Sequence, residues 1–157
     1  MTLFLTDPDD PGRIRPPAPP AVFGLPVRTL GLAAHWHSPA TGALLAAEVG
    51  RQARNLHTHL QRIALWASLG DAPALGAAVI DFWIILGPFG RDLRRRLLHK
   101  HATALAECGL IDYLSEHLEH GLDRHDPRNA LPGVVLARPV EGSRCFLRAP
   151  AKRGATS

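Results

Sequence analysis

The sequence predicts a mainly α-helical protein, a bundle of four helices between a disordered, proline-rich N-terminal arm and a small C-terminal β-hairpin. Residues 72–86 are apolar on every side except at Asp81, a pattern typical of a helix at the centre of a bundle. Residues 45–67 place apolar side chains at steps of three and four, which indicates an amphipathic helix. Glycines after the helical segments predict short joints between antiparallel neighbours: Gly70, Gly87, Gly109 and Gly121.

Length and composition favour one globular domain. A chain of 157 residues is long enough to bury a sizeable core, and 46% hydrophobic with 20% charged residues is the balance of a globular protein. Cys108 and Cys145 fall in no motif, which indicates reduced thiols, and the first ten residues lack the basic start of a secretory signal. The apolar run at 72–86 is too short to span a membrane. We expect a soluble, intracellular protein of the cytoplasm or nucleus.

The N-terminal and C-terminal regions differ from the middle of the chain. Pro16-Pro17-Ala18-Pro19-Pro20 favours a polyproline II conformation, and residues 133–140 and 143–148 read as strands joined by Glu141-Gly142. The expected segments are, in order, a flexible arm, the helical bundle, the hairpin and a tail: residues 1–27, 28–126, 127–150 and 151–157.

The first helix is expected from Pro39 to about Leu69, because Ser38 is a suitable N-cap and proline suits the first helical position. Its apolar seam consists of Leu45, Val49, Ala53, Leu56, Leu60, Ile63 and Ala67. The opposite face is polar and is expected to meet water: Glu48, Arg51, Arg54, His59 and Arg62.

Asp71 is a suitable N-cap for the second helix, and the sequence Gly87-Pro88-Phe89-Gly90 breaks the chain after it. The second, third and fourth helices are expected over residues 72–86, 91–108 and 110–120.

Asp81 is the single charge in the central apolar helix. A buried carboxylate is costly unless it is paired, so we expect an ion pair or hydrogen bond across the core. The candidate partners are Arg62, His57 and His101, and His101 is the expected one because it falls on the inward stripe of the third helix. This structural role is favoured over that of a catalytic acid or base.

The fourth predicted helix carries the one metal-like grouping. Asp112, Glu116 and His120 form a row at steps of four, His117 shares that face, and His125 follows closely. Three or four of these side chains are a suitable ligand set for Zn²⁺, Mn²⁺ or Fe²⁺. The other interpretation, a solvated polar face, is favoured because so loose a motif matches often by chance.

Arginines cluster at the start of the third predicted helix, at Arg91, Arg94, Arg95 and Arg96, with Lys100 beyond them. Four cations there oppose the helix dipole and need compensation. Acidic residues on the fourth helix or shortly before it are one source: Glu107, Asp112, Glu116 and Glu119. An acidic protein, nucleic-acid phosphate or anionic lipid is the other. The arginines form no single stripe and lack interleaved aromatics, so an internal or solvated role for the cluster is favoured over binding of an external anion.

Part of the chain resembles a known family. Pro39–Leu45, Gly50–Arg54, His57-Thr58, Ala77-Ala78 and Phe82 resemble a segment of an alphaherpesvirus virion protein family that is encoded in the short unique region and carries a Cys-Cys-His zinc motif. The resemblance covers about residues 38–108 and implies a non-enzymatic accessory protein. Cys108 stands without an adjacent pair of cysteines, so the family's zinc site is not carried over.

The chain has no glycine-rich phosphate loop and no Ser/His/Asp or Cys/His signature. We therefore expect a non-enzymatic accessory or interaction protein, an adaptor or virion-type subunit, that needs no cofactor and docks another protein. The expected contact residues are Arg91, Arg94, Arg95 and Arg96, with Trp36 as an aromatic anchor. A metal-dependent enzyme and a nucleic-acid-binding protein are the alternatives.

Overall fold

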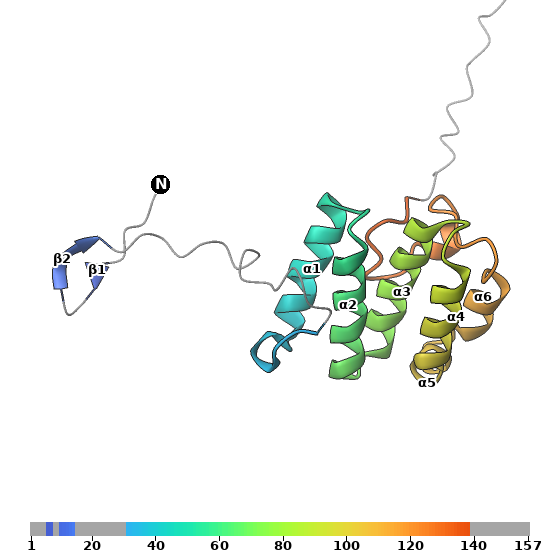
Figure 1. The fold of residues 1–157 in the computed structure, drawn as a ribbon, viewed down its shortest axis with the longest axis horizontal. Coiled ribbons are helices and arrows are strands. Elements are labelled where there is room, and N and C mark those ends of the chain that lie inside the picture. Colours follow the sequence, from blue (N-terminus) through green and yellow to red (C-terminus); the bar gives the residue numbers. More distant parts are fainter. Residues whose placement is uncertain (1–5, 8–9, 15–30, 139–157) are drawn as a thin grey trace, which may run out of the picture.

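The computed structural model of the protein describes residues 6–7, 10–14 and 31–138, and it confirms a mainly helical fold (Figure 1). Most of the arm expected over residues 1–27 lies outside the described residues. The described part of it holds two short strands, β1 (Thr6–Asp7) and β2 (Asp10–Ile14), which pair antiparallel and were not predicted. Within the described ranges, no helix has both the length and the apolar character needed to cross a membrane.

The long first helix predicted over 39–69 is wrong, because the chain turns in the middle of it. A 3₁₀ turn (Ala34–Trp36) leads into α1 (Pro39–Arg51), whose N-cap Ser38 accepts a hydrogen bond from the Thr41 amide as expected. Gln52 leaves the helical region, at φ −130° and ψ 63°, and α2 (Leu56–Leu69) runs back beside α1 (Figure 1).

This turn changes which residues of the predicted helix face inward. Leu56, expected in the apolar seam, is 39% exposed, whereas His59 and Arg62, expected on the polar face, are buried. The His59 Nε2–H donates to the Ala53 carbonyl at 2.8 Å, so a residue of α2 holds the turn that precedes it. The prediction of one continuous helix through residues 52–55 therefore assigned these side chains to the wrong faces.

The central helix is α3 (Ala72–Leu86), and it matches its predicted bounds. Asp71 caps it by accepting from the Ala74 amide at 3.0 Å, and Gly70 ends α2 in the left-handed region at φ 70°. Phe82 and Trp83 have no exposed surface, and they pack with side chains of α2 and of the helices that follow. The core therefore lies around α3, as the apolar run predicts.

Two further helices were predicted after α3, and the structure has three, so the described residues form six α-helices in place of four. Helix α4 (Arg91–Lys100) ends at His101, which has φ −112° and ψ 18°, and α5 (Ala102–Glu107) follows in a new direction. Helix α6 spans only Ile111–Glu116, after which a turn leads to Gly121 at φ 74°.

The predicted C-terminal hairpin is also absent from the residues that the structure describes, which end at residue 138. After a 3₁₀ turn (Pro127–Asn129), residues 133–138 contain no strand, and the second predicted strand lies outside the described residues. Residues 133–136, which we call the strap, return across the bundle to α2 and α3 (Figure 1). The amides of Val135 and Leu136 donate to the Asp81 carboxylate. In a hairpin, backbone carbonyls of the second strand would accept such hydrogen bonds.

Candidate functional site

Burial divides the arginine cluster of α4 into one internal and three external residues. Arg94 has no exposed surface, whereas Arg91, Arg95 and Arg96 are exposed. These neighbours differ because consecutive helical residues point about 100° apart, and only Arg94 points towards the core side of α4. The sequence prediction that Arg94 contacts a partner is therefore wrong.

Arg94 instead connects the turn before α4 to the turn after α6. Its Nη1 donates to the carbonyls of Gly87 at 2.7 Å and Phe89 at 2.5 Å. Its Nε and Nη2 donate to the carbonyls of Leu118 at 2.8 Å and Glu119 at 2.9 Å. The guanidinium also lies over the ring of Trp83, 5.8 Å from its centroid. Four of the five N–H groups of Arg94 thus donate to the turns before α4 and after α6.

The external cations, Arg91, Arg95, Arg96 and Lys100, form what we call the basic face. Arg91 Nε lies 2.7 Å from a carboxylate oxygen of Glu119, and Arg95 Nη1 lies 3.6 Å from Asp92. No ion pair within the described residues involves Arg96 or Lys100, and their spacing of four places them in one row. Arg54, Arg124 and Arg138 are likewise exposed without an ion pair among the described residues, but none of them lies on α4, where this row adjoins two further cations.

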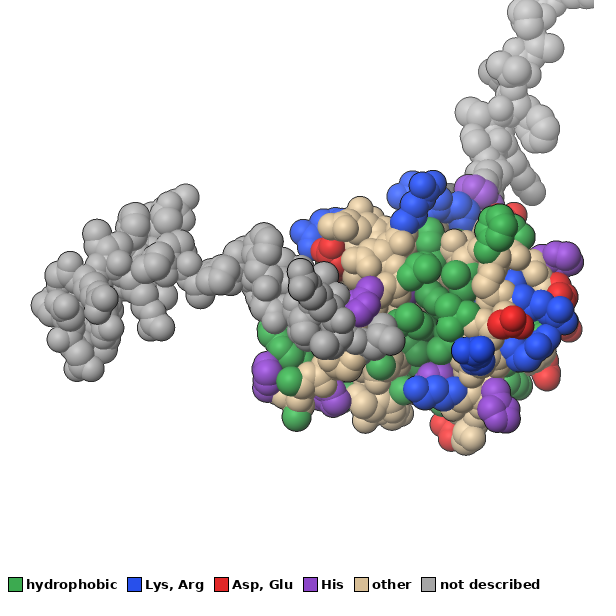
Figure 2. All heavy atoms as spheres, in the orientation of Figure 1, with side chains coloured by type: hydrophobic (Ala, Val, Ile, Leu, Met, Phe, Trp, Pro, Cys, Tyr) green, Lys and Arg blue, Asp and Glu red, His purple; other side chains and the backbone are tan. Residues whose placement is uncertain are grey.

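Acidic compensation of the cluster is smaller than expected. Of the four acidic side chains predicted to lie alongside, Glu119 alone forms an ion pair with α4, and the others are exposed: Glu107, Asp112 and Glu116. In Figure 2 one group of Lys and Arg side chains lies around α4, with a few acidic ones among them, and another lies at the top of the view. A band of hydrophobic side chains lies between α2 and α4. The basic face therefore borders an apolar surface.

Trp36 does not lie beside the basic face. It is half-buried at the start of α1, where it packs with Leu44 around Leu45 and Leu65, and α1 and α4 lie on opposite sides of α2 and α3 (Figure 1). The exposed aromatic near the arginines is Phe89, which is 78% exposed in the turn between α3 and α4. Helical periodicity could not identify it, but its position inside a Gly-Pro-Phe-Gly break was a usable signal.

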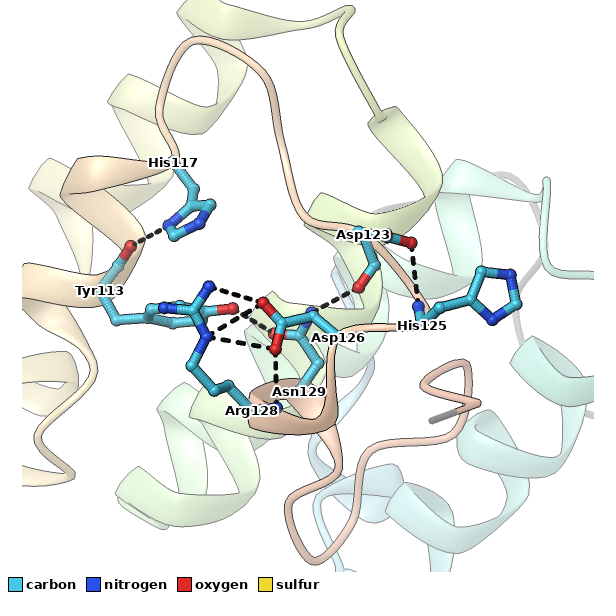
Figure 3. A network of polar contacts seen from close by, with 7 residues as sticks. All are labelled: Tyr113, His117, Asp123, His125, Asp126, Arg128 and Asn129. Carbon is cyan, nitrogen blue, oxygen red and sulfur yellow. Dashed lines mark hydrogen bonds and ion pairs between the residues drawn. The ribbon is translucent and has the colours of Figure 1, made fainter. Parts of the chain in front are cut away.

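The residues proposed as metal ligands do not converge. Helix α6 ends at Glu116, so the row through Asp112, Glu116 and His120 is interrupted before its last member. His117 Nδ1 donates to the Tyr113 carbonyl at 2.8 Å, and His125, on the other side of the Asp126–Arg128 pair, donates to the Arg138 carbonyl at 3.0 Å (Figure 3). Among the described residues, no group of three or more His, Cys, Asp or Glu side chains could hold a metal ion.

The same region instead forms a network that fixes the loop after α6 (Figure 3). The Tyr113 hydroxyl donates to the side chain of buried Asn129 at 2.8 Å, and Asn129 donates to the Asp123 carbonyl at 2.7 Å. Asp126 accepts from Arg128, whose guanidinium lies 5.1 Å from the centre of the Tyr113 ring. These contacts give Tyr113, Asn129, Asp126 and Arg128 a structural role, whereas Asp112, Glu116 and His120 are exposed.

Asp81 pairs with Arg62, which was one of its candidate partners, and the preferred partner His101 was wrong. Arg62 Nη1 lies 2.5 Å from Asp81 Oδ2, and both side chains are at most 3% exposed. The pair also binds the strap, because the Leu136 amide donates to Asp81 at 2.7 Å and Arg62 Nη2 donates to the Gly133 carbonyl at 2.6 Å. Asp81 therefore has a structural role that connects α2, α3 and the C-terminal segment.

His59 makes the stability of this fold depend on pH. Burial lowers the pKa of His59 below its ordinary value, and its Nδ1 has no hydrogen-bond partner. Between this lowered pKa and about 6.5, the unfolded chain binds more protons than the folded one, so the stability falls as the pH falls through that range. Burial also lowers the pKa of His101, so we expect His59→Gln, which keeps an N–H donor and cannot titrate, to reduce the dependence of the urea midpoint on pH without abolishing it. An unchanged slope would contradict this origin.

No protein-family model matches the chain, and the comparisons with curated proteins and with solved structures find no match either. The proposal that follows is therefore argued from the arrangement of the described residues.

Proposed function

We propose that this chain is a non-enzymatic interaction protein that docks an acidic protein partner through the basic face of α4. The observation that carries the proposal is the exposed row of Arg96 and Lys100, which has no counterion among the described residues. The buried charged groups have other tasks, since Arg62, Asp81 and Arg94 all hold the fold together. The charge of the row is therefore open to solvent ions or to a partner of opposite charge.

The arrangement of acidic side chains favours a protein over a nucleic acid or a lipid surface. Asp92 and Glu119 lie among the cations, and they lower the net positive charge that an extended, uniformly anionic surface would meet. A protein surface carries charges of both signs and can complement such a mixture. The accessory role implied by the resemblance to a virion family is compatible with this proposal.

Reversing the charge of the row tests the proposal. The probe is a short fluorescein-labelled peptide of alternating glutamate and serine, and its binding is measured by fluorescence anisotropy at low salt. Arg96→Glu combined with Lys100→Glu is expected to weaken binding by about tenfold or more, because two attractive contacts become repulsive. Arg54→Glu combined with Arg124→Glu makes the same charge change at two exposed arginines outside α4 and is the matched control.

The two double variants separate the proposal from simple net charge. The proposal requires the control pair to keep most of the affinity and raised salt to weaken the wild-type complex. Equal losses in both double variants would show that attraction is not localised to α4. Stronger binding to a single-stranded oligonucleotide of equal charge would favour the nucleic-acid alternative.

A further inference from the structure

We infer that Phe89 is the apolar anchor of this docking surface, so that the partner presents an acidic segment that also carries apolar side chains. This inference rests on the proposed function and names the chemistry of its partner. Phe89 is 78% exposed. The next most exposed large hydrophobic side chain among the described residues is Leu56, at 39%. An isolated exposed apolar residue is common on protein surfaces, so exposure alone does not identify an anchor.

The rigidity of the turn distinguishes Phe89 from an ordinary surface residue. Gly87 and Gly90, on either side of Pro88 and Phe89, adopt positive φ angles of 53° and 76°. The Phe89 amide donates to the Leu86 carbonyl at 3.1 Å, and its carbonyl accepts from the buried Arg94 guanidinium. The backbone that carries the ring is therefore fixed before any partner binds.

An aromatic side chain carried on a fixed backbone is an efficient anchor, because little more than its own two side-chain torsions has to be ordered on binding. Ordering a flexible side chain or loop on binding costs conformational entropy, and a preorganised one avoids most of that cost. Aromatic residues and arginines are also the types that contribute most to protein interfaces when they occur together. Arg94 acts here as a positioning residue, since it holds the carbonyls of Gly87 and Phe89 without reaching the surface.

The position of Phe89 connects it to the basic face. Phe89 is two residues before Arg91, at the N-terminal end of the helix that carries the four cations of the basic face. The apolar band of Figure 2 borders the same region. A partner segment with acidic side chains and one or two leucine or tryptophan residues would satisfy both surfaces at once. A purely acidic segment would leave the phenyl ring in water.

Two labelled peptides of equal negative charge test the inference. One alternates glutamate with serine, and the other replaces two of the serines by leucines. The wild-type protein is expected to bind the leucine peptide about tenfold more tightly, as expected for the burial of one large apolar contact. In Phe89→Ser this preference should disappear, whereas Leu131→Ser, at an exposed leucine outside the turn, should keep it. Circular dichroism of each variant verifies that the helices are formed.

The outcomes separate this inference from the proposed function. If wild-type protein binds both peptides equally, the anchor role of Phe89 is overturned and the basic face stands. If neither peptide binds at low salt, the proposed function is overturned as well. Vesicles of phosphatidylcholine and phosphatidylserine are the alternative ligand. If they bind more tightly than the leucine peptide and Phe89→Ser abolishes that binding, the partner is a membrane and not a protein.

Discussion

Asp81→Asn is expected to lower the free energy of unfolding by about 3–5 kcal/mol, because it leaves the Arg62 guanidinium buried without its counter-charge. The change also weakens the acceptor for the Val135 and Leu136 amides, so the strap should loosen. Urea unfolding followed by circular dichroism measures the first effect. Faster hydrogen exchange at those two amides measures the second.

Two controls identify the buried charge as the cause. Asp92→Asn removes a carboxylate that is 81% exposed and should change stability by no more than about 0.5 kcal/mol. Arg62→Met combined with Asp81→Leu removes both charges, and it should cost less than the sum of the two single changes. A loss below about 1 kcal/mol in Asp81→Asn would contradict the role that the structure gives this pair.

Arg94→Met is expected to lower the free energy of unfolding by about 3 kcal/mol or more, because four backbone carbonyls lose their common donor. The neighbouring change Arg95→Met should stay within about 0.5 kcal/mol, since that side chain is exposed. Both variants replace a cation by the same apolar side chain on adjacent positions of one helix. The difference between their free energies of unfolding therefore reflects burial and hydrogen bonding and not net charge. Equal stabilities would contradict the assignment of Arg94 as internal and Arg95 as external.

Local signals in the sequence located several elements correctly. Ser38 and Asp71 were identified as N-caps because their side chains follow rules that depend only on neighbouring residues. The all-round apolar pattern of residues 72–86 identified the central helix for the same reason. Helix caps and an apolar helix, which depend on residues close together in the chain, could therefore be predicted from the sequence alone.

Features that depend on contacts between distant residues could not be read in this way. Arg94 and Arg95 are adjacent and chemically identical, and only the packing of α4 decides which one is buried. The partner of Asp81 depended on the turn after α1, which changed the inward face of α2. The strap contains two adjacent β-branched residues, Val134 and Val135, as a strand often does, but its amides bond to the Asp81 carboxylate and not to a pairing strand.

The most direct test of the central claim is amide chemical-shift mapping by NMR with the leucine-bearing acidic peptide. We predict perturbations that concentrate on Phe89 and on the residues of the basic face, and that weaken together as salt is raised. Perturbations concentrated on α1 and Trp36 would place the docking surface on the opposite side of the bundle and would contradict the account.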